Sequence, residues 1–294
     1  MRITDNMAMN AVLQGNARST QRLSKAAREA SSGERVGAPS DDPVAWTAAH
    51  GHDARIARME NRAQTTSRAA GDLELAESTL ASVGDMIQQA RELALTTANG
   101  AVDAQTRSNV AAQVSQIRDA VLGQMNTRGA SGYLFGGTRT DRAPFDTAGN
   151  FTGNDTPVSV EVADGVTARA NASGARAFTN AGTGGRDILA DLQSLATALT
   201  SNNLPAIRTS LDALDAGRRQ VTDASVETGL ASERLRSVAE VTDNALIRTR
   251  DARAREVEVD LPSALSSLTI ARGAYERGVS VTRELLQTTT VGKF

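Results

Sequence analysis

Apolar residues spaced alternately three and four positions apart are the feature that most limits what this chain can fold into. Such spacing places a continuous apolar seam along one side of an α-helix. The longest series ends at Ala98-Asn99-Gly100, where Asn and Gly can take the left-handed conformation that closes a helix. Its members are Leu73, Ala76, Leu80, Val83, Ile87, Ala90 and Ala94. The sequence therefore predicts a long helix that packs against other helices.

Further helical patterns lie on both sides of a different kind of sequence. A second helix follows after a short break, which predicts an antiparallel helical hairpin. Its apolar positions are Val110, Val114, Ile117, Val121 and Met125. Helicity resumes near Asp187 and continues to the end of the chain, with interruptions at Leu204-Pro205 and Pro262. The apolar positions between these prolines are Ile207, Leu211, Leu214, Val221, Leu235, Val238, Thr242 and Ala245.

The centre of the chain, from Tyr133 to about Asn180, loses the helical period. Tyr133-Leu134-Phe135 and Val158-Ser159-Val160-Glu161-Val162 are predicted to form strands between turns rich in Gly, Asn and Pro. The predicted fold is mainly α, an elongated rod of long antiparallel helices with a small β-rich insertion. We divide it into an assembly segment with its hinge (1–43), the first part of the rod (44–132), the insertion (133–183), the second part of the rod (184–261) and a last assembly segment (262–294).

The two terminal segments carry apolar stripes too thin to fold alone. Their single large residues are separated by Ala, Thr, Ser, Asn and Gln, so we expect these segments to order only when paired, as a coiled coil formed on assembly. The predicted assembly-interface residues are Met7, Leu13, Leu23, Leu268, Tyr275, Leu285 and Leu286.

Composition narrows the classes of function. The chain has 32 Lys and Arg residues and 34 Asp and Glu residues, and the two signs of charge are interspersed. No strong positive potential therefore favours binding to nucleic acid. The absence of Cys excludes disulfides, thiol catalysis and thiolate metal sites. Apolar runs are too short for membrane insertion, and Met1–Met7 lacks the apolar core of a cleaved signal peptide.

The stretch from Ser31 to Pro43 predicts a hinge followed by a sharp helix start. Gly33 and Gly37 can break the preceding helix, while Ser40, Asp41 and Asp42 offer N-cap acceptors just before Pro43, which suits the first helical position. The residues assigned to the hinge and helix start are Gly33, Arg35, Gly37, Pro39, Ser40, Asp41, Asp42 and Pro43.

Candidate chemical sites are weak. His50 and His52 point to nearly opposite sides of the predicted helix and cannot share a metal. Asp41 and Asp42 have neither a His nor a plausible nucleophile beside them in that motif, which favours helix capping over acid–base catalysis. Gly182-Thr183-Gly184-Gly185-Arg186 lacks the Gly-Lys-Ser/Thr ending of a phosphate loop. We therefore predict no enzyme activity and no catalytic, cofactor or metal site.

The hinge string, after a Met-Arg-Ile-Thr start, resembles the flagellin superfamily and within it the hook–filament junction family. Further motifs that carry the resemblance are Arg91-Glu92-Leu93-Ala94, Tyr133-Leu134-Phe135-Gly136-Gly137, Ala143-Pro144-Phe145 and Gly184-Gly185-Arg186-Asp187-Ile188-Leu189. The resemblance implies a structural flagellar subunit, exported by the type III pathway, located outside the cell and assembled as a ring or short tube. Its implied partners are further copies of itself, the first hook-associated protein, flagellin and an export chaperone.

Two alternatives remain at this point. One is a flagellin filament subunit, although flagellins usually follow the paired acids with Ala-Ala-Gly where this chain has Pro43. The other is a secreted coiled-coil oligomer unrelated to the flagellum, which would form a discrete dimer or trimer and not join polymer ends.

Overall fold

The computed structural model describes residues 2–99, 102–181 and 185–291, and within these it leaves out the side chains of residues 2–6, 8, 286 and 288–291. The described chain separates into two compact units. Unit 1 consists of Met1–Arg58 and Ala245–Phe294, and unit 2 consists of Met59–Asn244. Two long helices, α2 (Pro43–Thr97) and α6 (Leu204–Val257), contribute to both units. The division of the chain into the five segments proposed above stays a prediction.

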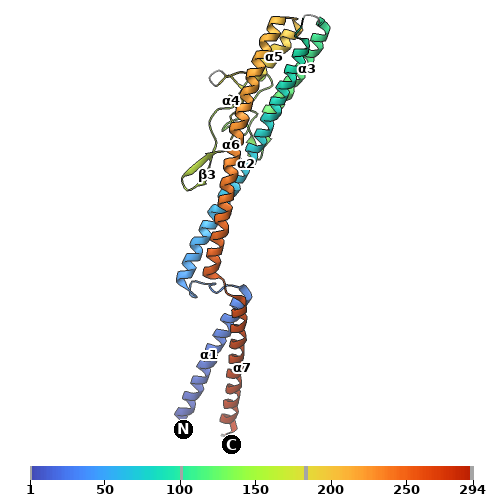
Figure 1. The fold of residues 1–294 in the computed structure, drawn as a ribbon. Coiled ribbons are helices and arrows are strands. Elements are labelled where there is room, and N and C mark those ends of the chain that lie inside the picture. The colour runs from blue at the N-terminus through green and yellow to red at the C-terminus, as the bar shows by residue number, and fades with distance from the viewer. Residues whose placement is uncertain (1, 100–101, 182–184, 292–294) are drawn as a thin grey trace. The chain divides into compact units, whose positions relative to one another are not determined.

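Unit 2 is built on a helical bundle whose core comes from the predicted seams. Besides α2 and α6 it contains α3 (Ala104–Met125) and α5 (Ile188–Thr200), which pack against each other (Figure 1). All seven seam residues from Leu73 to Ala94 are at most 1% exposed, and the predicted α3 residues are buried as well. The apolar periodicity therefore identified the correct faces, because each face packs onto another helix.

The centre of the chain forms a small β-containing insertion, as predicted. Two antiparallel hairpins pair β1 (Arg128–Gly129) with β2 (Gly132–Tyr133), and β3 (Ser159–Ala163) with β4 (Val166–Arg169). A short helix, α4 (Gly174–Phe178), follows. The mainly α fold with a β-rich insertion is thus confirmed.

One strand prediction was wrong in part. Only Tyr133 of the predicted strand Tyr133-Leu134-Phe135 belongs to β2. Leu134 and Phe135 leave the hairpin and enter the core of unit 2, where Phe135 is fully buried and packs edge-on against Phe178 at 5.0 Å between ring centroids. Gly137, with φ +68°, then turns the chain away. Burial of the aromatic ring outweighs the β-propensity of this short run.

Unit 1 contains two terminal helices, α1 (Arg2–Ser32) and α7 (Leu261–Val291), which lie side by side (Figure 1). They are antiparallel, since residues near the end of α1 bond to residues before the start of α7, and Asn16 bonds to Thr282. Across the described residues, no helix combines the length and apolarity that crossing a membrane requires.

Candidate assembly interface

Two short connections in unit 1, residues 33–42 between α1 and α2 and residues 258–260 between α6 and α7, are hydrogen-bonded to one another. We call them the joint. The Arg35 amide donates to the Val257 carbonyl at 2.7 Å, and the Val259 amide donates to the Gly33 carbonyl at 2.9 Å. Glu34 and Glu258 form the antiparallel bridge between these bonds. The joint therefore holds together two chain segments that are more than 200 residues apart in sequence.

The joint begins and ends with well-formed helix caps. Gly33 has φ +73°, a left-handed conformation, and its amide donates to the Glu29 carbonyl at 2.9 Å, which closes α1. Asp42 caps α2, because its Oδ1 accepts from the amides of Val44 at 3.2 Å and Ala45 at 3.1 Å. Pro43 occupies the first position of α2, where its missing N–H costs nothing.

Asp41 and Arg35 organise the loop between these caps. One oxygen of Asp41, Oδ2, accepts from the amides of Gly37 at 3.2 Å and Ala38 at 3.0 Å. Arg35 pairs with Asp42 at 3.1 Å and donates to the Glu256 carbonyl at 2.8 Å. Pro39 and Ser40 are exposed on the outside of the loop.

The pKa of the Asp42 carboxyl lies below its ordinary value, because it accepts first from the Ala45 amide and then from Arg35. Both donors favour the charged form. Arg253 forms two further salt bridges in this region, one with Asp53 at 2.6 Å and one with Glu34 at 3.8 Å. These pairs are partly exposed to solvent, so they define the geometry of the joint more than they stabilise it.

A small apolar core supports the joint from inside. Val36, Ala45, Ala49 and Val257 are each at most 4% exposed, and the ring of Trp46 packs against them. Trp46 is the single Trp of the chain, so its fluorescence reports this region alone.

Replacing Gly33 with Ala is expected to weaken the joint by about 1–2 kcal/mol, because an L side chain strains the left-handed conformation. Urea unfolding followed by Trp46 fluorescence would measure the change. Gly37→Ala is the matched control: Gly37 does not have positive φ, and an added Cβ would meet only Asp41 Oδ2, at 4.0 Å. Equal unfolding midpoints for the two variants would contradict the role given to Gly33.

Buried and half-buried residues along α1 and α7 recur at the three-four spacing and face each other. On α7 they include the predicted assembly residues Leu268, Tyr275 and Leu285, and on α1 the same spacing continues through polar residues. The α1 members are Met9, Val12, Asn16, Ser19, Leu23, Ala26 and Ala30. The α7 members are Ala264, Leu268, Ala271, Tyr275, Gly278, Thr282 and Leu285.

The predicted assembly residues fall into two groups in this arrangement. Leu23, Leu268, Tyr275 and Leu285 lie in the seam between the two helices. Met7 and Leu13 point outward and are 68% and 51% exposed. The side chain of Leu286 lies outside the described residues. The structure thus gives the first group a partner within the chain.

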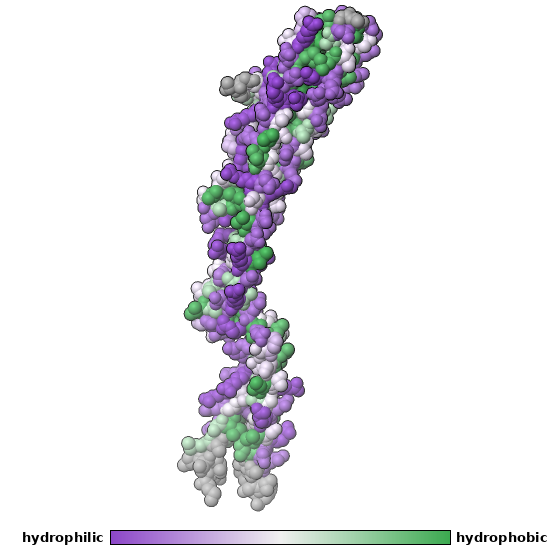
Figure 2. All heavy atoms as spheres, viewed as in Figure 1, coloured by the Kyte–Doolittle hydropathy of each residue, from purple (hydrophilic) through white to green (hydrophobic). Residues whose placement is uncertain are grey.

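The outer sides of the terminal helices also carry apolar residues that the sequence reading did not single out. On α7, Leu265, Ile270 and Val281 are 55%, 68% and 48% exposed. The face drawn in Figure 2 is mainly hydrophilic, with separate hydrophobic patches. Single exposed apolar residues are ordinary, but their recurrence on a thin helix pair is typical of a surface that packs against other subunits.

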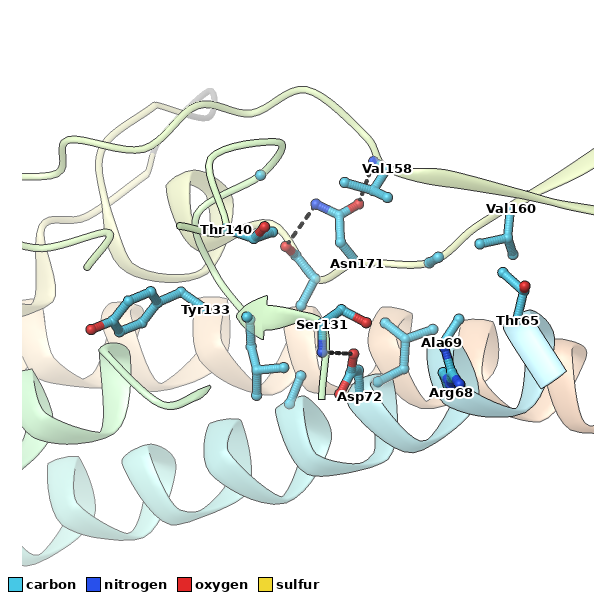
Figure 3. Close-up of a pocket in the computed structure, with 17 residues that line it drawn as sticks. Thr65, Arg68, Ala69, Asp72, Ser131, Tyr133, Thr140, Val158, Val160 and Asn171 are labelled. Carbon is cyan, nitrogen blue, oxygen red and sulfur yellow. Dashed lines mark hydrogen bonds between the residues drawn. The ribbon is translucent and has the colours of Figure 1, made fainter. Parts of the chain in front are cut away.

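A pocket of about 200 Å³ lies where the insertion meets α2, and Figure 3 shows its lining. Its buried carboxylate, Asp72, accepts from the amides of Ala130 at 2.7 Å and Ser131 at 3.1 Å. Asn171 accepts from the Val158 amide at 2.9 Å. Because both groups are already used to hold the insertion, the pocket has the character of an anchoring site. Among the described residues, no group of three or more acidic or His side chains could hold a metal ion.

Two amides fasten the rest of the insertion to the bundle, and sequence reasoning missed both. Asn126 exchanges two hydrogen bonds with the backbone of Phe145, at 3.0 and 3.1 Å. Gln220 on α6 accepts from the Arg186 amide at 2.7 Å and donates to the carbonyls of Ala177, Thr179 and Arg186, each at 3.1 Å. Neither residue lies on an apolar seam, so no periodic signal marks them.

A buried arginine, also missed, connects three helix ends in unit 2. Arg107 on α3 is 3% exposed and donates to the carbonyls of Thr97 at 3.1 Å and Asn99 at 2.6 Å, and to the side chain of Asn202. A signal was present here, because extending the seam of α3 by one three-residue step from Val110 reaches Arg107.

Comparisons with known proteins agree with this architecture. Residues 3–140 match the bacterial flagellin N-terminal helical region. The chain is 31% identical over 182 residues to flagellar hook-associated protein 3 of Salmonella typhimurium, covering 61% of this chain and 57% of the relative. It is 31% identical over 166 residues to the Escherichia coli protein of the same name, covering 55% and 52%. The chain thus spans little more than half the length of these relatives.

Solved structures share the fold at lower identity. A flagellar hook-associated protein from Vibrio parahaemolyticus superposes with a TM-score of 0.67 at 23% identity, over 74% of this chain and all of that one. FlgL of Bacillus cereus gives 0.58 at 18% identity, over 68% and 97%. The flagellar junction protein FlgL of Legionella pneumophila gives 0.54 at 14% identity, over 73% and 100%. Taken together, these comparisons make the chain similar to the flagellin N-terminal helical region over residues 3–140, and similar to flagellar hook-associated protein 3 over little more than half of that protein's length.

Proposed function

We propose that this chain is a structural subunit of the bacterial flagellum that joins the hook-associated proteins to the flagellin filament. The observation that carries the proposal is the 31% identity to two proteins named flagellar hook-associated protein 3. The fold supports it, since neighbours of similar architecture include a flagellar junction protein. The role is mechanical and has no chemical step.

The geometry of unit 1 suits such a subunit. The α1–α7 pair has a seam of small and polar residues and carries exposed apolar residues on its outside. Met7, Leu13, Ile270 and Val281 would be covered by further copies of the chain in a ring or short tube. The coiled-coil pairing predicted to form on assembly would then extend or tighten a pairing that already exists in the single chain.

The proposed partners are further copies of the chain, the first hook-associated protein on one side and flagellin on the other. An export chaperone would bind the chain before secretion through the type III pathway. The functional location would be outside the cell, in the flagellum. These assignments follow from the names of the relatives and from the resemblance of the hinge motif.

Electron microscopy of cells lacking the protein tests the role. The expected result is complete hooks without filaments, with flagellin released into the medium, and restoration of filaments by the parent gene. Normal filaments in the deletion strain would reject the proposal and favour an unrelated secreted oligomer. Antibody labelling separates the flagellin alternative, because a junction subunit labels only the hook–filament boundary, whereas a filament subunit labels the whole filament.

A further inference from the structure

The main apolar core of unit 2 covers only part of α2 and α6. Its buried residues begin at Ala76 on α2 and end at Val221 on α6, with Ala224 half-buried beside them. Figure 1 shows α3 and α5 beside the upper part of this helix pair, and the β3–β4 hairpin below them. The next apolar cluster along the pair is formed by α2, α6 and the hairpin with the residue that follows it. The bundle therefore narrows from four helices to two at this level.

This second cluster joins three segments that are distant in the sequence. Leu73 on α2 and Leu235 on α6 are at most 1% exposed, and Val162 of β3 lies with them at 7%. The hydrogen bond from the Ser232 hydroxyl to the Ala70 carbonyl connects the two helices here, but it is long, at 3.4 Å. The other members of the cluster are small or half-buried, namely Ala69, Ala70, Val160, Ala168, Ala170, Ala231 and Val238. Two leucines and a few alanines would give the helix pair little apolar surface to bury without the hairpin.

Ion pairs attach the hairpin to each of the two helices. Arg62 on α2 donates to Glu161 at 3.0 Å and to Asp164, in the turn between β3 and β4, at 2.7 Å. On the other side, Arg169 of β4 donates to Glu227 on α6 at 3.0 Å. A two-stranded hairpin is marginally stable alone, so the hairpin and the helix pair stabilise each other.

We propose that the β3–β4 hairpin is a brace, which clamps α2 to α6 where the bundle narrows from four helices to two. Val162 supplies the apolar contact, and the pairs of Arg62 and Arg169 hold the hairpin across both helices. Loss of the brace would let this narrow segment open locally while the main core stays closed, because the two clusters share no residue among those described.

The mechanical consequence rests on the proposed function. A subunit between hook and filament transmits load along its long helices, and the brace would make the narrow segment stiffer than two helices alone. The clamping itself is a property of the single chain and can be measured without a flagellum.

Hydrogen exchange of the purified full chain, followed by mass spectrometry, tests the brace. Val162→Ala removes apolar contact from the cluster, and Arg62→Ala removes the attachment to α2. We expect the amides of residues 63–72 on α2 and 232–242 on α6 to exchange roughly tenfold faster in Val162→Ala. Arg62→Ala should show a smaller increase in the same segments, because its pairs are partly exposed. Residues 110–121 of α3 should keep the parent's exchange rates.

Matched controls make the result specific to the brace. Val166→Ala is the same change at a position of β4 that is 53% exposed, and Arg58→Ala removes an exposed arginine one turn before Arg62. Both should exchange like the parent. Faster exchange confined to residues 159–169 would show that the hairpin packs on the helices without holding them, and an equal increase in α3 would show that the bundle opens as one unit. Either result, or equal effects in the controls, would overturn the proposal and leave the junction role untouched.

Discussion

Replacing Ile270 with Asp is expected to leave the purified chain folded and to abolish filament attachment. Ile270 is 68% exposed on α7, so the carboxylate remains in water in the single chain. In the proposed tube, a neighbouring subunit would cover this position. Each subunit would then lose roughly 1.5–3 kcal/mol of apolar burial and carry the further penalty of a buried charge. Repetition around a ring of identical subunits multiplies that loss.

The measurement compares the thermal melt of the variant with its ability to restore filaments in the deletion strain, after its secretion into the medium is verified. Val166→Asp is the control, because Val166 is 53% exposed in β4 of the insertion and lies outside the terminal pair. It should support filaments. An Ile270→Asp strain with normal filaments would show that the outer face of α7 is not an assembly surface.

The seam residues would not make this distinction. Leu268 and Leu285 are half-buried between α1 and α7 in the single chain. An Asp at either position would weaken the helix pair itself, so a loss of filaments could follow from misfolding. Outward-facing residues separate assembly from folding because their neighbours within the chain are few.

Replacing Arg107 with Leu is expected to lower the stability of unit 2 more than any surface change. The substitution removes the guanidinium that donates to the Thr97 carbonyl, the Asn99 carbonyl and the Asn202 side chain. The two carbonyls at the end of α2 then lose their hydrogen bonds from Arg107. The buried Thr97 carbonyl left unsatisfied costs about 1–3 kcal/mol, and the part-buried Asn99 carbonyl costs at most about as much, so the total is roughly 1–6 kcal/mol. Urea unfolding followed by circular dichroism at helical wavelengths measures the loss.

Arg208→Leu controls for the loss of an arginine in the same unit. Arg208 is exposed on α6, and its replacement should change stability by no more than about 0.5 kcal/mol. Arg107→Lys should be intermediate, since one ammonium group cannot reproduce the planar fork of the guanidinium. If Arg107→Leu unfolds at the same urea concentration as Arg208→Leu, the three helix ends do not depend on this side chain.

What the sequence by itself determined is where the long helices lie and which faces they bury. The seam from Leu73 to Ala94, the cap at Asp42 and the helix start at Pro43 all depend on residues a few positions apart, and the structure has them where the spacing indicated. Local geometry makes such features readable, because a helix brings residues three and four apart onto one face and a cap bonds within one turn.

What only the tertiary structure decided is how polar residues connect these helices. Asn16 bonds to a residue 266 positions away, Gln220 to carbonyls 34 to 43 positions away, and Arg107 to Asn202 across 95 positions. Contacts between distant segments also made Phe135 a core residue, although the local sequence predicted a strand residue. A polar side chain carries no periodic signal of its partner, and its burial is favourable only after distant segments have come together.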